Sequence, residues 1–138
     1  MCLRRRFKRN ENVIVTAGAK ELVLDLEERC CIRQVAVNID MNDTTGTTES
    51  RLIIKVDEDE VLNESLYYLQ KFYNVWASSA HSNRPFQYTA WDATNKIYRM
   101  IFIDLGRVER RFAVFFENHD TTNKAEVNVG VIYDILED

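Results

Sequence analysis

Apolar and polar residues alternate along much of this chain, which is the period of a strand that buries one face. The clearest example is residues 32–40, where Arg33, Val35, Val37 and Ile39 share one face and a more polar set shares the other. A strand of this kind points its apolar face into a core. We therefore expect the valine-rich face to be the buried one.

Other segments show the same alternation or a short apolar run, and each predicts a strand. They are residues 13–16, 21–26, 51–56, 86–91, 96–103, 110–117 and 127–136. Residues 92–95 suit a hairpin connection, and residues 17–19 suit a bend or a hairpin turn. Short strands at regular spacing, without alternating helices, predict an all-β and mainly antiparallel fold, either a sandwich or a barrel.

The period changes in residues 62–76, which predict the one helix of the chain. Asn63 is a suitable N-cap, and Glu64 lies in the first turn, where a carboxylate is favourable. Apolar side chains recur there at helical spacing: Leu62, Leu66, Leu69, Phe72, Tyr73 and Trp76. We expect this stripe to pack on the sheet.

The composition is that of one ordinary globular domain. The chain has 138 residues, of which 46% are hydrophobic and 29% are charged, so residues 11–138 are expected to form a single domain with its own core. No segment approaches the roughly 18 consecutive apolar residues that cross a bilayer, and no apolar signal core follows the first basic residues. We expect no membrane span and a protein made in the cytoplasm.

Charge is distributed unevenly along the chain. Residues 1–9 carry five basic residues and no acid, whereas the rest carries 13 basic and 22 acidic residues, a net charge of −9. The basic residues are Arg4, Arg5, Arg6, Lys8 and Arg9. Residues 1–10 are predicted to be a basic N-terminal arm that contacts nucleic acid, lies on an acidic neighbouring subunit, acts as a nuclear address or stays solvated. The sequence leaves these roles open.

Potential metal ligands are few and scattered. The cysteines and histidines are Cys2, Cys30, Cys31, His81 and His119. We expect reduced thiols, with Cys30 and Cys31 pointing to opposite faces of a strand. The acidic run at residues 57–60 lacks the spacing and the central glycine of a calcium loop, so it is expected to be a solvated turn. No metal and no cofactor are predicted.

The motifs of common enzyme sites are absent. The chain contains no G-x-x-x-x-G-K-[ST], no G-x-G-x-x-G and no G-x-S-x-G, and it has four glycines in all. His81 lies among serines and His119 lies between Asn118 and Asp120, so a His/Ser/Asp site would need the two loops to meet. Exposed loop histidines are the simpler interpretation, and we predict that the chain is not an enzyme.

Two polar loops, residues 41–50 and 77–85, are candidate contact regions. Their candidate contact residues are Thr44, Thr45, Thr47, Thr48, His81 and Arg84. The aromatic residues Trp76, Tyr88 and Trp91 could stack on a sugar or a base, although core packing is the simpler role.

The order of a basic arm, strands, one inserted helix and further strands resembles the single jelly-roll subunits of viral capsids and of virion vertex or tail assemblies. The residues that carry this resemblance are Arg4-Arg5-Arg6-Phe7-Lys8-Arg9, loop 44–48 and the closing segments 112–116 and 127–132. It is a resemblance of architecture, and it implies a jelly-roll-like β-sandwich. The chain is short for a capsid jelly roll, which favours a minor capsid, connector, tail or decorating role.

The resemblance implies a structural protein that assembles with copies of itself and with other virion proteins, in a virion assembled in the host cytoplasm. The arm would then contact the genome or a neighbour, and deleting residues 1–10 would leave the fold intact but weaken assembly in a salt-dependent way. The alternative is a monomeric, cytoplasmic β-sandwich module that recognises a carbohydrate or a protein through residues 41–50 and 77–85. A third interpretation is an enzyme that uses His81 and His119.

Overall fold

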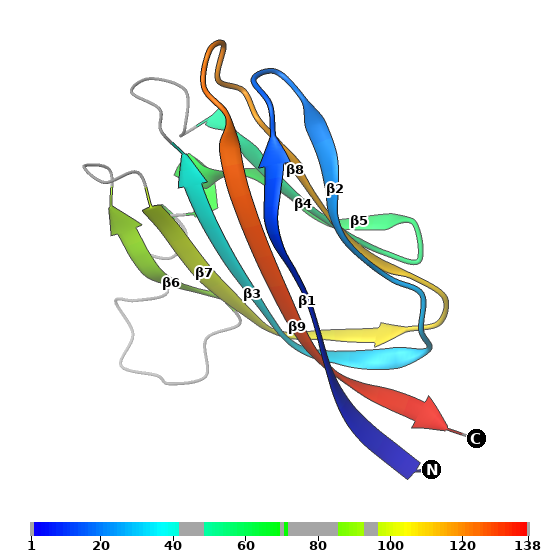
Figure 1. Ribbon diagram of the computed structural model, residues 1–138. Coiled ribbons are helices and arrows are strands. Elements are labelled where there is room, and N and C mark those ends of the chain that lie inside the picture. Colours follow the sequence, from blue (N-terminus) through cyan, green and yellow to red (C-terminus); the bar gives the residue numbers. More distant parts are fainter. Residues whose placement is uncertain (1, 42–48, 70, 72–85, 93–96, 138) are drawn as a thin grey trace.

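The computed structural model describes residues 2–41, 49–69, 71, 86–92 and 97–137. These residues form two antiparallel sheets (Figure 1). The strands are β1 (Cys2–Val15), β2 (Lys20–Leu26), β3 (Cys30–Met41), β4 (Arg51–Val56), β5 (Asp59–Ser65), β6 (Phe86–Asp92), β7 (Ile97–Val108), β8 (Phe112–Glu117) and β9 (Ala125–Glu137). The five-stranded sheet has the order β1-β9-β3-β7-β6, and the four-stranded sheet has the order β2-β8-β4-β5.

This strand order is that of a jelly roll with one additional strand. When β6 is set aside and the other strands are numbered along the chain, the sheets have the orders 1-8-3-6 and 2-7-4-5. Those orders arise when two Greek keys fold into two facing sheets. The predicted fold class, an antiparallel jelly-roll-like β-sandwich, is confirmed.

The core lies between the two sheets and is built by the alternation seen in the sequence. Phe112, Val114 and Phe116 of β8 are fully buried, as are Leu52 and Ile54 of β4. The five-stranded sheet contributes the predicted face of the last strand: Val127, Val129, Val131 and Tyr133. The pairing of β6 with β7 across residues 93–96, which lie outside the described residues, also agrees with the predicted hairpin.

One inward-facing prediction in β3 is wrong. Val35, Val37 and Ile39 are buried as expected, but Ile32 is buried and Arg33 is half exposed. The register of β3 against both neighbours shifts between Ile32 and Gln34. A β-bulge reverses the facing of the residues that precede it, so alternation extrapolated through Arg33 gives the wrong face.

The predicted helix over residues 62–76 is replaced by a strand at its start. Residues 62–65 belong to β5, which pairs with β4, and only residues 66–69 and 71 are helical among those described. Ser65, not Asn63, caps the turn, because its Oγ accepts a hydrogen bond from the Tyr68 N–H at 3.3 Å. Leu66 and Leu69 are buried as the stripe predicted. Residues 70 and 72–85, which include Trp76, lie outside the described residues.

The acidic run is more than a solvated turn. Asp57 and Glu58 join β4 to β5 with positive φ angles of 50° and 73°, as in a type I′ turn. The Asp57 carboxylate accepts backbone N–H bonds from Glu109, Arg110 and Arg111 at 2.9, 2.7 and 3.0 Å. These bonds hold the pKa of Asp57 below its usual range, and the bond from Glu109 has the largest effect.

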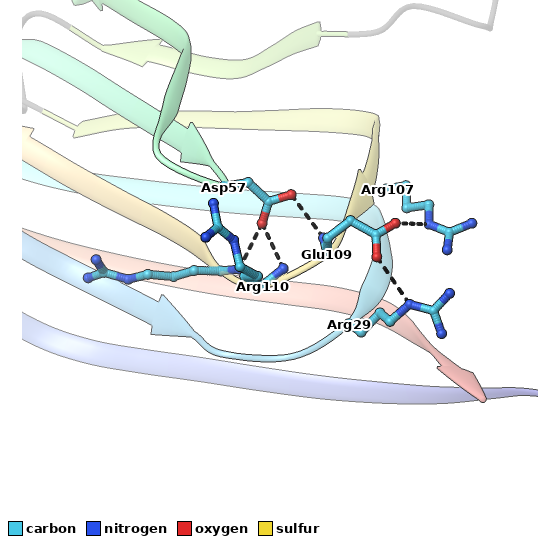
Figure 2. A network of polar contacts seen from close by, with 6 residues as sticks. Arg29, Asp57, Arg107, Glu109 and Arg110 are labelled. Atoms are coloured by element: carbon cyan, nitrogen blue, oxygen red, sulfur yellow. Dashed lines mark hydrogen bonds and ion pairs between the residues drawn. The ribbon is translucent and has the colours of Figure 1, made fainter. Parts of the chain in front are cut away.

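The same end of the sandwich carries a small ionic network (Figure 2). Glu109, held by Asp57 through its backbone, accepts hydrogen bonds from Arg29 at 3.1 Å and from Arg107. The contacts join the β2–β3 connection, the end of β7 and the β7–β8 connection. These side chains are exposed, so we assign the network a local fixing role rather than a large share of stability.

Cys30 and Cys31 are both free thiols, and they face opposite sides of β3 as expected. Cys30 is buried, and this burial raises the pKa of its thiol to about 12. The thiol is therefore neutral at physiological pH and is a poor nucleophile.

The predicted boundary between an arm and a domain at residue 10 does not correspond to a break in the structure. Strand β1 runs from Cys2 to Val15 and pairs with β9 along its length, from Cys2 opposite Glu137 to Val15 opposite Ala125. In Figure 1, β1 lies beside β9 from one end of the sandwich to the other. The basic segment is therefore a strand of the domain.

Candidate assembly surface

Strand β1 is the end strand of the five-stranded sheet and has β9 as its one neighbour in that sheet. A long end strand presents backbone N–H and C=O groups on its outer edge, which makes it a natural place for another chain to dock. Natural proteins also place charges on such edges to limit unselective pairing. Strand β1 carries five cations, Arg4, Arg5, Arg6, Lys8 and Arg9.

Two side chains of the basic segment attach β1 to the domain. Lys8 Nζ donates a hydrogen bond of 2.7 Å to the backbone oxygen of Asp25, and Asn10 Nδ2 donates one of 2.7 Å to the backbone oxygen of Val23. Both acceptors belong to β2, the end strand of the other sheet. Side chains of β1 thus close this side of the sandwich between the two end strands.

A second attachment is a triad of charged side chains. Arg5 Nε lies 2.9 Å from Asp134 Oδ1, and Arg33 Nε lies 2.6 Å from Asp134 Oδ2. The Asp134 side chain is only 6% exposed. The hydrogen bonds from Arg5 and, to a smaller extent, from Arg33 lower the pKa of Asp134 to about 2. The β3 bulge makes this possible, because it turns Arg33 away from the core.

The triad predicts how stability depends on pH. A carboxylate whose pKa is lowered by folding stabilises the folded state above its ordinary pKa, and this contribution is lost as the pH falls. For Asp134 the loss should occur between about pH 4 and about pH 2. Asp134→Asn should therefore flatten the pH profile in that window, measured by urea denaturation at a series of pH values. Parallel profiles for the two proteins would contradict the assignment.

Three further cations of the segment, Arg4, Arg6 and Arg9, are exposed on β1. Arg9 Nη1 lies 3.3 Å from the exposed carboxylate of Glu11. An exposed pair at this distance contributes little to stability.

An apolar groove lies next to this edge, on the outer face of the five-stranded sheet. Its volume is about 340 Å³, and its floor includes Ala36, Ile101 and Gly130. Phe7, which is 61% exposed, covers Gly130 so closely that a Cβ there would lie 3.1 Å from the ring. Arg9, Glu11 and Arg99 are among the polar residues that line the groove. Glycine at position 130 therefore leaves room for the Phe7 ring.

The opposite side of the molecule has the opposite charge. The other sheet has β2 at one end, beside β1, and β5 at the opposite end. Strands β8 and β4 lie between β2 and β5. Glu58, Asp59 and Glu60 are exposed there, together with Val61, and Glu64 is half exposed. Residues 57–65 contain no basic side chain. The sandwich therefore has a basic edge at β1 and an acidic edge at β5.

Several predicted contact residues cannot be placed relative to these edges. Thr44, Thr45, Thr47, Thr48, His81 and Arg84 all lie outside the described residues. The same holds for the side chains of Tyr88 and Trp91. The prediction that His81 is an exposed loop residue therefore stays a prediction.

His119 itself lies beside the start of β4. Its ring Nε2 hydrogen-bonds with Glu117, and its backbone N–H donates to Ser50 Oγ at 3.0 Å. Asn118 and Asp120 are buried, and their side chains organise the loop that leads to β9. Asn118 Nδ2 donates to the backbone oxygens of Val15 and Asn123, each at 3.0 Å.

Metal ligands and membrane spans were also sought in the structure. Within the described ranges, no three His, Cys, Asp or Glu side chains come together as potential metal ligands. No helix in that same part of the chain is long and apolar enough to cross a membrane.

Comparison with known proteins places the fold in context. No protein-family model and no curated protein matches the chain. Among solved structures, it matches latent PorU from Porphyromonas gingivalis with a TM-score of 0.58 at 6% identity, over 98% of this chain and 13% of PorU. It also matches FLHE with a TM-score of 0.50 at 9% identity, over 98% of both chains.

A third match is a chain of the cyanophage Pam1 capsid asymmetric unit. The TM-score is 0.54 at 14% identity, over 97% of this chain and 86% of the capsid chain. The likeness is one of fold. It agrees with the architectural resemblance seen in the sequence and covers nearly the whole length of both chains.

Sequence reasoning found the cations but missed what surrounds them. The partners of Arg5 and Lys8, namely Asp134 and the Asp25 carbonyl, are 129 and 17 residues away in sequence. Phe7 was the one sequence feature that pointed to the groove. An aromatic ring in a solvated arm would gain no stability from burial, so a phenylalanine within a basic segment suggests a contact with the domain. The acidic edge was visible as residues 57–60, but its position opposite β1 required the strand order.

Proposed function

We propose that this chain is a structural subunit of a virion, in a minor capsid, connector, tail or decorating role, which assembles in the host cytoplasm. Copies would associate head to tail, with the basic edge of one against the acidic edge of the next. The observation that carries this proposal is the opposite charge of the two end strands, β1 and β5. The fold shared with a phage capsid chain supports the virion setting. The proposed role requires no reaction and no cofactor.

The physics of such a contact is simple. Arg4, Arg6 and Arg9 are exposed on one edge, and Asp59 and Glu60 are exposed on the other. Attraction between such edges sets which surfaces meet and in what register. Because the two edges are different surfaces, repetition gives a ring when the rotation closes and a filament when it does not.

Charge reversal at either edge tests the proposal. Arg6→Glu with Arg9→Glu, or Asp59→Lys with Glu60→Lys, should weaken association by about tenfold or more at low salt. Combining all four substitutions should restore it, because the edges are again opposite in sign. The measurement is sedimentation velocity over a range of protein concentrations.

The four-substitution protein has the same net charge as the native chain, so restoration cannot reflect a change in overall charge. A matched control is Lys20→Glu with Lys124→Glu, which changes the net charge as much as the β1 variant but at exposed positions outside β1 and β5. Equal weakening by this control, or no restoration in the combined protein, would overturn the head-to-tail contact.

The alternative function is a monomeric binding module that recognises a carbohydrate or protein through its loops. Residues 42–48 and 72–85, which hold most of those loops, lie outside the described residues. Contact between the basic edge and nucleic acid is a further alternative for the same exposed cations. A monomer that binds a ligand without assembling would favour the module.

A further inference from the structure

A second surface feature lies away from the β1 edge, at one end of the four-stranded sheet. It is a hollow of about 410 Å³, formed where β4 begins, β5 ends and the chain leaves β8. Its lining residues are Glu49, Arg51, Ser65, Tyr67, Tyr68 and His119. The hollow combines aromatic rings with charged groups of both signs.

The two tyrosines are exposed for a structural reason. Leu66 and Leu69 take the inward positions of the helical turn that Ser65 caps, so Tyr67 and Tyr68 project from the surface. They are 47% and 48% exposed, and their ring centroids lie 5.4 Å apart with the planes at 74°. The rings therefore meet edge to face, and Lys71 Nζ lies 5.9 Å from the Tyr68 ring centroid. Because Lys71 already lies over Tyr68, Tyr67 is the better stacking surface for a ligand.

The arginine of the hollow is fixed in place by neutral groups. Arg51 Nε donates to Asn63 Oδ1 at 2.7 Å, and Nη2 donates to the Asn63 backbone oxygen at 2.8 Å. Neither acceptor carries a charge. The guanidinium has five N–H groups in general, so these two bonds leave donors available on an oriented side chain.

The other polar groups complement this donor. Glu49 is exposed and supplies a carboxylate acceptor, and His119 is oriented by its hydrogen bond with Glu117. A hydroxyl group both donates and accepts a hydrogen bond, so a site with an adjacent carboxylate and guanidinium suits a polyhydroxylated ligand. An anionic ligand is less suitable, because the carboxylate of Glu49 lines the hollow and that of Glu117 lies against His119.

We propose that this hollow binds a neutral saccharide. One pyranose face stacks on Tyr67, while Arg51 and Glu49 bond the ring hydroxyls. The site uses no residue of the β1 edge or of the β5 acidic run, so its failure and the failure of the proposed assembly are separate results.

Saturation-transfer NMR on the full chain tests the proposal. The probes are neutral methyl pyranosides and trisaccharides of glucose, galactose, mannose and N-acetylglucosamine, with sialyllactose as the anionic member. At least one neutral probe should bind. Tyr67→Ala should weaken it by about tenfold, whereas Tyr67→Phe keeps the ring and should preserve binding. Arg51→Met should also weaken it.

Phe7→Ala is the matched control, because it removes an exposed aromatic ring from the other sheet and should leave saccharide binding unchanged. The proposal is overturned if no neutral probe binds, if sialyllactose alone binds, or if Tyr67→Ala binds as the native chain does. Tyr67 is about half exposed, so this variant is expected to fold.

Discussion

Replacing Phe116 with alanine should lower the free energy of unfolding by about 3–5 kcal/mol. Phe116 is fully buried between the sheets, on the same face of β8 as Phe112 and Val114. Alanine would remove most of the packing contacts of this side chain. It would leave a cavity in the core that the surrounding strands cannot easily fill. The measurement is urea denaturation followed by circular dichroism.

The neighbouring Phe115 is the matched control, since it has the same side chain on the opposite face of the same strand. Phe115 is half exposed and lies beneath two cations, with Lys20 Nζ and Lys55 Nζ each 5.3 Å from the ring centroid. Phe115→Ala should lower stability by only about 1–2 kcal/mol. Equal losses for the two variants would mean that the facing of β8, and with it the sandwich, is wrong.

Deleting residues 1–10 should destabilise the fold by about 3 kcal/mol or more, a large part of the 5–15 kcal/mol that is usual for a domain. This reverses the expectation drawn from the sequence. The deletion removes the pairing of Cys2 to Asn10 with β9 and the cover that Phe7 gives to Gly130. It also removes the Arg5 contact to Asp134 and the Lys8 contact to β2.

A thermal melt of the shortened chain, compared with the native chain, measures this effect. The Arg6→Glu and Arg9→Glu protein is its control, because it keeps the strand and changes only exposed charge. A synthetic peptide of residues 1–12 should restore part of the lost stability by pairing again with β9. A shortened chain that melts at the native temperature would show that residues 1–10 are an appended arm after all.

Much of the fold was predictable because alternation is a local signal. The buried faces of β4, β8 and β9 follow directly from the period of their apolar residues. The failures occurred where a tertiary contact overrode that period. Arg33 sits in a bulge and bonds Asp134 on another strand, and residues 62–65 pair with β4 although their apolar spacing favours a helix.

The functional surface was predictable only in part. The cations of residues 4–9 stand out in the sequence, but an edge strand and a free arm have the same composition. What distinguishes them is the pairing with β9, whose residues lie at the far end of the chain. The opposition of the basic and acidic edges depends on strand order, and short strands with similar patterns do not encode that order locally.

The most direct test of self-association is the solution mass of the native chain, measured by light scattering at about 0.01 M and about 1 M salt, where charges are screened beyond roughly 30 Å and 3 Å respectively. Head-to-tail contact between β1 and β5 predicts an oligomer or filament at low salt that dissociates toward the 16.2 kDa monomer at high salt. A monomer at both salt concentrations, across the accessible range of protein concentration, would contradict it.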